Sequence, residues 1–381
     1  MPLSNFALQR LPVAFSACAA CLLTSCATSS KIGDVRLNQI QVIGTHNSYH
    51  QLGHPSLRAL MAKVAPNETA GLEYGHRPLS EQFDLGIRQI ELDCFADPAG
   101  GLYAHPRGVE WARAAGLPEV PNQDPNGELL RPGIKVMHVQ DIDYMTSVLT
   151  LMDGLRQVRE WSAKHPRHLP IFILLELKED APAPLLTKPL PFDEKQLDEL
   201  ESEILSVFKR DRIVTPDSVR GKETTLPEAL RKHGWPRLDS VRGKVMFGLD
   251  NGGALRDLYL KGHSALEGRL IFVSVPAENP AAAWMKENDP VEGFDRIQAL
   301  VKAGFMVRTR SDADTIEARK NDTRRREKAF ASGAQFISTD YREPNPAFSN
   351  YSVHFEGDAV ARMNPVAGKS PARVLDLETQ K

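Results

Sequence analysis

Eight short apolar runs, separated by longer amphipathic stretches, recur along most of this 381-residue chain. Several runs are rich in β-branched residues and flanked by Gly or Pro, which is typical of buried strands. The runs occupy residues 40–44, 87–92, 134–138, 170–177, 244–249, 270–275, 303–307 and 334–338. Strands that alternate with helices over about 310 residues predict an α/β fold, specifically a distorted (β/α)8 barrel of the TIM type.

A doubly wound open sheet is the alternative fold for the same alternation. That fold places a Gly-rich phosphate-binding loop after its first strand. The first run of this chain ends instead in Gly44-Thr45-His46-Asn47, which has a single glycine. The barrel is therefore the favoured prediction.

The amphipathic stretches predict helices over 145–164, 192–209, 292–302 and 313–332, where apolar residues recur every three or four positions. Segments 97–133 and 179–191 are rich in Pro and Gly, and they predict long loops after the second and fourth strands. In a barrel, such loops lie over the mouth. We expect one barrel domain over 38–345 and an irregular tail over 346–381.

The composition excludes one class of partner. The chain has 47 Lys and Arg against 49 Asp and Glu, which gives a formal net charge of -2. A nucleic-acid-binding domain usually carries a basic surplus, and only 7% of these residues are aromatic and available for base stacking. We therefore expect no nucleic-acid partner, and nothing in the sequence implies a protein partner.

The N-terminal residues resemble an export signal. An apolar segment over 11–23 follows Arg10, and it is too short to span a bilayer. The sequence Leu23-Thr24-Ser25-Cys26 resembles the lipobox of bacterial lipoproteins, in which the Cys is acylated. We expect a lipoprotein signal peptide over 1–25, a lipid anchor on Cys26, a tether over 26–37 and an exported protein at the membrane of the cell envelope. The alternative is an ordinary signal peptide and a secreted protein, and Cys94 is expected to be a buried thiol.

Polar side chains follow four of the predicted strands. The first strand ends in His46 and Asn47, and the third ends in His138. Glu91 and Asp93 end the second strand and share one face, and Glu176 ends the fourth. Barrel enzymes assemble their sites where the carboxyl ends of the strands meet. The sequence therefore predicts a site at this rim.

The oxygen-bearing members of this group suit a hard cation. Asn47, Glu91, Asp93 and Glu176 offer only oxygen ligands, which Ca²⁺ and Mg²⁺ prefer over the ligand sets typical of Zn²⁺. Crowded carboxylates repel one another unless a cation lies between them. The alternative is that the carboxylates pair with neighbouring basic residues, of which the candidates are Arg88, Lys178 and Arg310.

The histidines at the rim suit proton transfer, because imidazole titrates near neutral pH. His46 and His138 are the candidates, and His105 is a rival because it lies in the long loop after Asp93. We expect the remaining histidines, for example His50, His54, His165 and His168, to be surface residues.

Taken together, these residues resemble phosphoinositide-specific phospholipase C, and in particular its bacterial Ca²⁺-dependent branch. The resemblance lies in Gly44-Thr45-His46-Asn47-Ser48-Tyr49, Glu91-Leu92-Asp93, His138, Glu176 and the closing segments 307–312 and 333–341. It implies Ca²⁺ as the cofactor, with Asn47, Glu91, Asp93 and Glu176 as ligands. It also implies that His46 stabilises charge on the phosphoryl oxygens and that His138 protonates the departing oxygen.

The chemistry of a phosphodiester agrees with these residue types. A divalent cation neutralises the anionic charge that repels a nucleophile, and an imidazolium protonates a poor leaving group. In an inositol lipid the neighbouring 2-hydroxyl can attack phosphorus internally, which gives diacylglycerol and a cyclic inositol phosphate. Glu176 is placed to accept the proton of that hydroxyl. Lys178 is a candidate to bind a phosphate oxygen, and Arg308 and Arg310 are weaker candidates.

Two alternative functions fit the same barrel. A glycerophosphodiester phosphodiesterase shares the Glu-x-Asp pair, but its first strand usually ends in His-Arg-Gly, whereas this chain has His46-Asn47-Ser48. A non-catalytic lipoprotein that binds lipid headgroups would be indicated by the loss of a histidine or ligand, and all six positions are occupied here. A phospholipid or headgroup phosphodiester substrate is therefore the expected partner.

Overall fold

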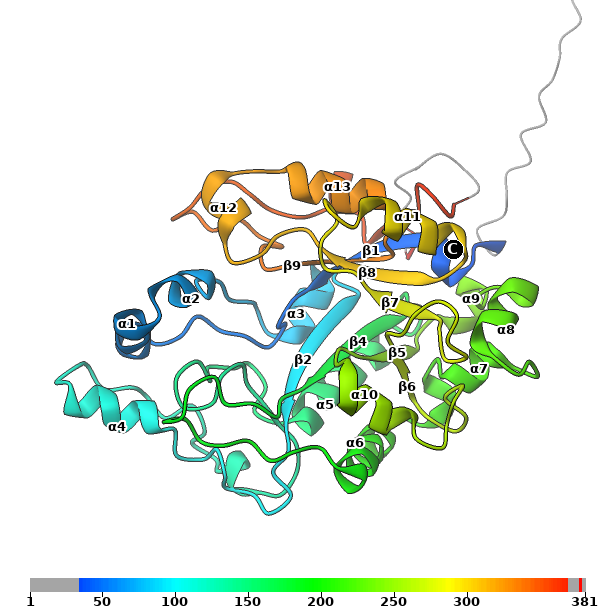
Figure 1. The fold of residues 1–381 in the computed structure, drawn as a ribbon. Coiled ribbons are helices and arrows are strands. Elements are labelled where there is room, and N and C mark those ends of the chain that lie inside the picture. Colours follow the sequence, from blue (N-terminus) through cyan, green and yellow to red (C-terminus); the bar gives the residue numbers. More distant parts are fainter. Residues whose placement is uncertain (1–33, 369–376, 379–381) are drawn as a thin grey trace, which may run out of the picture. The chain divides into compact units, whose positions relative to one another are not determined.

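The computed structural model describes residues 34–368 and 377–378, which belong to a compact unit spanning 32–381. Its centre is a nearly closed barrel of parallel strands with helices between them (Figure 1). Neighbouring strands follow the order β6-β5-β4-β2-β1-β9-β8-β7, and a parallel bridge from Ser274 to Trp284 brings the two ends together. The predicted (β/α)8 barrel is thus confirmed. The barrel strands are β1 (Ile40–Thr45), β2 (Gln89–Phe95), β4 (Ile171–Leu177), β5 (Val245–Leu249), β6 (Ile271–Val273), β7 (Trp284–Lys286), β8 (Met306–Arg310) and β9 (Phe336–Thr339).

Helices occupy the connections between the strands. Those before β5 are α1 (Pro55–Val64), α2 (Pro66–Gly71), α3 (Leu79–Asp84), α4 (Arg107–Ala114), α5 (Leu151–Lys164), α6 (Glu194–Val207), α7 (Pro216–Arg220), α8 (Leu226–His233) and α9 (Leu238–Val241). Those after β5 are α10 (Gly253–Leu260), α11 (Phe294–Lys302), α12 (Ile316–Lys320) and α13 (Arg324–Ser332).

Two predicted helices differ from the structure for local reasons. The helix expected over 145–164 begins only at Leu151, because the side chain of Thr150 caps it by accepting a 3.1 Å hydrogen bond from Asp153 N. The helix expected over 313–332 is divided into α12 and α13. Asn321 ends α12 in a left-handed conformation, with φ 51°, which a continuous helix does not contain.

The run over 134–138 is not a barrel strand, and that part of the prediction was wrong. It forms the short strand β3 (Lys135–Val136), which pairs antiparallel with the end of β2. The long loop after β2 therefore turns back along that strand, and β4 takes the next place in the barrel. The missing barrel strand is β7, which ends the buried apolar run 281–285; three of the five residues in that run are alanine, which is depleted in strands.

The two ends of the described chain are more ordered than expected. The irregular tail expected over 346–381 contributes β10 (Ala361–Met363), which pairs antiparallel with β1. Val35 and Leu37, within the expected tether over 26–37, are buried. The signal peptide over 1–25 and Cys26 lie outside the described residues. No helix in the described part of the chain is both long and apolar enough to cross a membrane.

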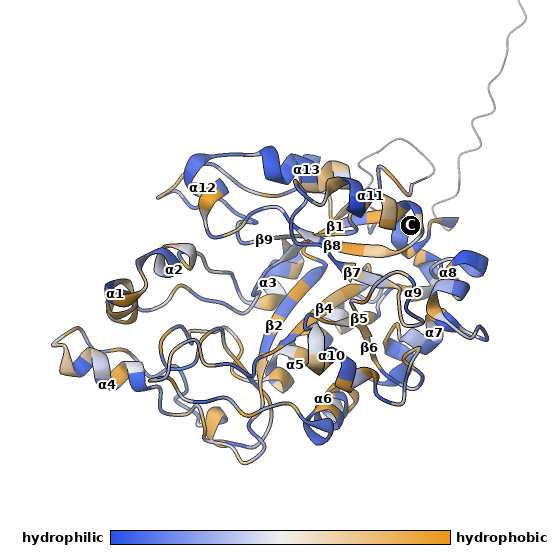
Figure 2. Ribbon diagram, in the orientation of Figure 1, coloured by the Kyte–Doolittle hydropathy of each residue, from blue (hydrophilic) through white to orange (hydrophobic). Residues whose placement is uncertain are grey.

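The barrel interior is filled by large side chains facing small ones. Phe172 of β4 stacks on Phe336 of β9 with ring centroids 4.4 Å apart. Gly248 of β5 makes room for Phe172, because a Cβ on Gly248 would lie 2.4 Å from that ring. Figure 2 shows β4 coloured as apolar along most of its length, in agreement with its burial. This packed interior fixes the strand ends at which the polar residues lie.

Candidate active site

The end of β1 is fixed to β2 through Ser48. Its backbone N–H donates to the carbonyl of Glu91 (2.9 Å), and its hydroxyl accepts from the backbone N–H of Glu91 (2.8 Å). Asn47, one residue earlier, has a left-handed backbone with φ 44°, a conformation that Asn adopts more readily than most residues. These bonds hold Asn47 beside the carboxylates of β2.

Three carboxylates meet at this rim. Glu91 and Asp93 come from β2, and Glu176 of β4 is the direct parallel neighbour of Asp93. One oxygen from each carboxylate lies within 4.8 Å of the others. Glu91 and Asp93 are buried, whereas Glu176 is partly exposed. The structure therefore brings together the three acidic residues that the sequence singled out.

Burial makes this cluster electrostatically costly. Desolvation raises the pKa of Glu91 to about 7, although Arg308 opposes the shift and Asp250 and Glu176 add to it. Desolvation also raises the pKa of Asp93 well above its usual value, and the negative charge of Glu176 adds to the effect. A cation placed among these oxygens relieves both effects.

The oxygen atoms of the cluster fit a hard cation. Oδ1 of Asn47 is buried and accepts no hydrogen bond within the described residues, while its Nδ2 donates to the hydroxyl of Tyr74 (3.0 Å). Neither oxygen of Asp93 meets hydrogen-bond geometry with a donor in that same part of the chain, although Lys178 Nζ lies 3.3 Å from Oδ2. Buried acceptors without donors are rare, and an all-oxygen set of this kind is what Ca²⁺ takes.

His46 forms the first of two histidine–aspartate pairs. Its Nδ1 lies 2.8 Å from Oδ1 of Asp340, which follows β9, the barrel neighbour of β1. The other ring nitrogen, Nε2, lies 3.9 Å from Oε1 of Glu91 and so faces the oxygen cluster. Burial holds the pKa of His46 well below its usual value, and the positive charges of Arg310 and Arg308 lower it further.

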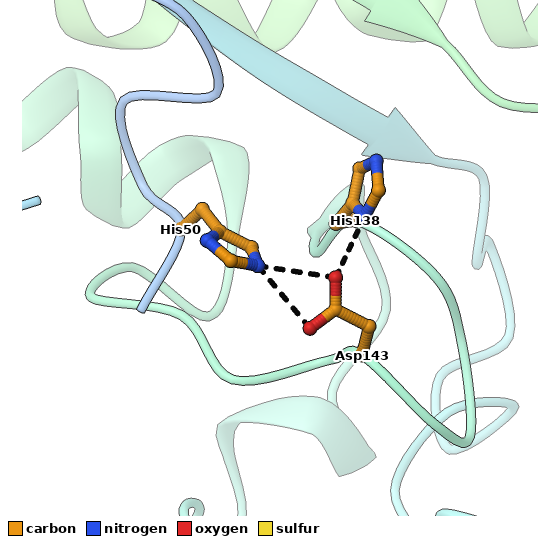
Figure 3. A group of neighbouring side chains, drawn as sticks. All are labelled: His50, His138 and Asp143. Atoms are coloured by element: carbon orange, nitrogen blue, oxygen red, sulfur yellow. Dashed lines mark hydrogen bonds and ion pairs between the residues drawn. The ribbon is translucent and has the colours of Figure 1, made fainter. Parts of the chain in front are cut away.

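His138 forms the second pair. Its Nδ1 lies 2.7 Å from Oδ2 of Asp143, and Nε2 of His50 approaches the same carboxylate at 3.1 Å and 3.2 Å (Figure 3). Although burial opposes ionisation, His50 and His138 hold the pKa of Asp143 below its usual value. Figure 3 shows the second nitrogen of His138 on the side of the ring away from Asp143.

Tyr74 connects the two pairs. Its ring centroid lies 6.1 Å from that of His46 and 4.6 Å from that of His50. The ring of His50 in turn meets that of His138 edge-on, with centroids 5.7 Å apart. The two candidate histidines therefore lie on one continuous wall of the mouth.

The basic residues that are candidates to bind a phosphate oxygen form ion pairs with carboxylates in this structure. Lys178 lies between Asp93 (3.3 Å) and Glu176 (3.1 Å). Arg310 pairs with Asp340 (2.9 Å), and Arg308 pairs with Glu91 (2.6 Å). The expected pairing with Lys178 is therefore present, whereas Arg88 pairs with Glu378 instead. Binding of a phosphate oxygen by Lys178 or Arg310 remains a prediction.

The expectation that the remaining histidines are surface residues was wrong for two of them. His50 is fully buried against Asp143, and His168 is buried below α5, where it bonds to Ser162. Both lie in loops, from which we inferred exposure, but the sequence does not show how such loops fold back. His105, the rival for the second role, is exposed.

A (β/α)8 barrel with an oxygen cluster for a hard cation, beside two histidine–aspartate pairs, defines a metal-assisted phosphodiesterase. The chain belongs to the family described as "Phosphoinositide phospholipase C, Ca2+-dependent", whose sequence profile matches residues 35–365. It is accordingly a phosphodiesterase of the phospholipase C type, from a family that depends on Ca²⁺.

The solved structures that match this chain are remote from it in sequence. A Ca²⁺-dependent phosphatidylinositol-specific phospholipase C from Streptomyces antibioticus is 16% identical, with 80% of this chain and 95% of that chain covered and a TM-score of 0.48. A calcium-dependent phosphoinositol-specific phospholipase C from Pseudomonas sp is 14% identical, with 87% and 96% covered and a TM-score of 0.49. A glycerophosphoryl diester phosphodiesterase from Parabacteroides distasonis is 13% identical, with 81% and 86% covered and a TM-score of 0.29. No curated protein matches the chain at a significant level.

Proposed function

We propose that this protein cleaves phosphatidylinositol-type lipids to diacylglycerol and a cyclic inositol phosphate. The observation that carries the proposal is the placement of His46 and His138, each held by its own aspartate, on one wall of a mouth that contains the oxygen cluster. Asn47, Glu91, Asp93 and Glu176 would hold the calcium ion. When bound, that ion supplies a Lewis acid that neutralises charge on the phosphoryl oxygens and acidifies the attacking hydroxyl.

The side chains have separate roles in this reaction. The 2-hydroxyl oxygen of inositol forms a bond to phosphorus, and Glu176, the one partly exposed member of the cluster, accepts its proton. In its protonated form, with Nδ1–H donating to Asp340, His46 also donates a hydrogen bond from Nε2 to a phosphoryl oxygen, whose negative charge stabilises the imidazolium. The bond from phosphorus to the diacylglycerol oxygen breaks, and that oxygen takes a proton from Nε2 of His138. Asp143 orients His138 and stabilises its charged form.

The experiment that tests this function uses a chain beginning at residue 27, because the unit over 32–381 has its own hydrophobic core. Phosphatidylinositol cleavage is measured with calcium, with a calcium chelator, and with His46→Ala. We expect release of diacylglycerol with calcium only, and loss of release in His46→Ala. Cleavage of glycerophosphoinositol to glycerol phosphate, without lipid cleavage, would favour the glycerophosphodiester phosphodiesterase instead.

We further propose that Cys26 carries a lipid anchor after export and holds the protein at the membrane of the cell envelope. The support for this proposal is the sequence Leu23-Thr24-Ser25-Cys26 after an apolar segment. Full-length protein made in a bacterial host should incorporate labelled fatty acid, and Cys26→Ser should not. Label that persists in Cys26→Ser would contradict the proposal.

A further inference from the structure

Two groups of side chains with metal-binding atoms lie at the mouth, and they differ in the atoms that they offer. The oxygen cluster offers carboxylate and amide oxygens, which suit Ca²⁺. The other group is His50, His138 and Asp143, in which one carboxylate faces two imidazoles (Figure 3). Imidazole nitrogens together with a carboxylate oxygen are ligands that Zn²⁺ takes in proteins. The second group therefore suits a different ion from the first.

The ligand atoms of the second group are close together. Nδ1 of His138 lies 2.7 Å from Oδ2 of Asp143, and Nε2 of His50 lies 3.1 Å from the same oxygen. One ligand atom from each residue lies within 4.8 Å of the others. Zinc bonds of about 2.0–2.2 Å in a tetrahedral shell place neighbouring ligand atoms roughly 3.3 Å apart. Rotations of the side chains alone therefore bring these atoms to the spacing of a zinc site.

Backbone hydrogen bonds hold the three residues in place. The turn after His138 is closed by Val139 and Asp143, whose N–H groups each donate to the other's carbonyl (3.0 Å). The segment that contains His50 is attached to the same loop, because His50 forms a bridge with Thr146. The ligands thus come from two segments that are fixed to each other. Such preorganisation lowers the entropic cost of closing a metal site.

The burial of these side chains leaves one coordination position open. The side chain of His50 is 0% exposed and that of Asp143 is 6% exposed, whereas that of His138 is 20% exposed. His138 lies on the wall of the mouth, so water can reach an ion from that side. Three protein ligands with water in the fourth position is the arrangement of open zinc sites.

The tautomers of the two rings are compatible with zinc. An ion on Nε2 of His50 requires the ring proton on Nδ1, and an ion on Nδ1 of His138 requires it on Nε2. Nδ1 of His50 has no hydrogen-bond partner in the part of the chain that the structure describes, so a proton placed there breaks no bond at that atom. Nε2 of His138 lies on the side of the ring away from Asp143 (Figure 3). The ion then replaces the two hydrogen bonds to Asp143 with bonds to all three residues.

We propose that Zn²⁺ binds to His50, His138 and Asp143 and that the bound ion inhibits lipid cleavage. The site itself goes beyond the proposed function, whereas the inhibition rests on it, because His138 is the acid of that reaction. Zinc on Nδ1 keeps His138 uncharged, so the ring can release its remaining proton only by becoming an imidazolate. A neutral imidazole is a far weaker acid than an imidazolium, so the leaving oxygen is no longer protonated. Calcium does not displace the zinc, because the two groups share no residue.

Isothermal titration calorimetry with zinc chloride tests the site without measuring catalysis. The chain beginning at residue 27 is titrated in excess calcium, which fills the oxygen cluster, and its single cysteine, Cys94, is buried. We expect one zinc ion per chain. His50→Gln and His138→Gln should each weaken binding by roughly tenfold or more, since loss of a hydrogen-bond partner behind a ligand alone costs that much. His105→Gln and His354→Gln, which alter exposed histidines, are the matched controls and should bind zinc as the unaltered chain does.

Three results of the titration would overturn the zinc site. The first is no binding by the unaltered chain, or equally tight binding by His138→Gln. That variant is decisive even if His50→Gln does not fold, because the side chain of His138 is partly exposed. The second is a loss in Asp93→Asn equal to that in His138→Gln, which would place the ion in the oxygen cluster. The third is an equal loss in His105→Gln, which would mean adventitious binding by surface histidines.

Activity on two substrates tests the inhibition and separates it from the proposed function. Zinc at ten times its Kd fills about 90% of the sites, so cleavage of phosphatidylinositol in excess calcium should slow by about tenfold. An aryl phosphodiester of inositol should be slowed much less, because its leaving group needs no proton. Equal slowing on both substrates, or undiminished lipid cleavage by the zinc-bound protein, would overturn the inhibition through His138. Failure of the unaltered, zinc-free chain to cleave either substrate would overturn the proposed function, while the zinc site measured by calorimetry would stand.

Discussion

Nδ1 of His46 lies 2.8 Å from Oδ1 of Asp340, although the two residues are 294 positions apart in the sequence. They meet because the first and last strands of the barrel are neighbours, so that Thr45 of β1 lies beside Thr339 of β9. Closure of the barrel is therefore what directs the second nitrogen of His46 toward the oxygen cluster. The aspartate is also held by Arg310, which fixes its orientation.

Asp340→Asn tests this relationship. An amide at this position can present its nitrogen to His46 and favour the wrong tautomer, and it carries no charge to stabilise an imidazolium. We expect kcat to fall by about 10²-fold with little change in KM, because orientation and charge act mainly in the transition state. Asp358→Asn, which removes the exposed partner of Arg342, is the control and should be nearly neutral.

The pair of His138 and Asp143 predicts that the rate lost on mutation depends on the leaving group of the substrate. If Asp143 positions His138 as the acid, Asp143→Asn should slow cleavage of a lipid, whose alkoxide leaving group needs a proton. We expect a loss of about 10²-fold on the lipid and a much smaller loss on an aryl phosphodiester of inositol, whose leaving group needs no proton. Equal losses on both substrates would mean that Asp143 serves the fold rather than proton transfer.

The assignment of His138 over His105 is tested by comparing the two variants. His138→Ala should lower kcat by about 10²–10⁴-fold on the lipid, because the proton donor is removed. His105→Ala should keep nearly full activity, since its side chain is exposed to solvent. An active His138→Ala together with an inactive His105→Ala would reverse the assignment.

The oxygen cluster predicts that calcium stabilises the fold. A ligand that binds only the native state at 100 times its Kd adds about 2.7 kcal/mol to the free energy of unfolding. We expect calcium to raise the Tm of the unaltered chain and to have a much smaller effect on Asp93→Asn, because Asp93 is the most buried of the three acids. Glu223→Gln, which alters an exposed ion pair, should respond to calcium as the unaltered chain does.

The burial of His168 predicts that the free energy of unfolding falls in acid. Burial lowers its pKa to about 4, against about 6.5 in an unfolded chain, although its bond to the Leu169 carbonyl opposes the shift. Between these pH values the unfolded chain binds the extra proton, so the free energy of unfolding falls by roughly 3 kcal/mol as the pH drops from 6.5 to 4. His168→Gln should flatten the pH dependence of urea unfolding over this range, whereas His105→Gln should leave it unchanged.

Much of the fold was predictable because apolar runs and amphipathic stretches report strands and helices directly. The ends of β2 and β4 were predicted together with their carboxylates. Glu91 and Asp93 lie two residues apart in β2, so strand alternation places them on one face, and Glu176 ends the neighbouring strand β4. β7 was missed because three of the five residues in its apolar run, 281–285, are alanine, which is depleted in strands, whereas the equally short β6 is rich in β-branched and aromatic residues. β3 was taken for a barrel strand because sequence alone does not distinguish a strand that continues the barrel from one that turns back.

The supporting residues of the site were harder to predict than the acids. Asp340 follows the end of a predicted strand, as Asp93 does. The rule that polar residues at the carboxyl ends of barrel strands lie at the mouth therefore applies to both residues. Asp143 and His50 lie in loops without periodicity, and only the folded chain brings them to His138. Contacts made by loops across the mouth depend on tertiary packing, which local pattern does not encode.

In the proposed reaction, the inositol 2-hydroxyl attacks phosphorus in a calcium-dependent step in which His46 takes part. This reaction can be followed by ³¹P NMR of phosphatidylinositol in mixed micelles. The unaltered chain and His46→Ala are each measured in calcium and in a calcium chelator. We predict a cyclic inositol phosphodiester signal from the unaltered chain in calcium alone, and none from His46→Ala. Formation of an acyclic phosphate as the first product, or cleavage that is unaffected by the chelator, would contradict the account.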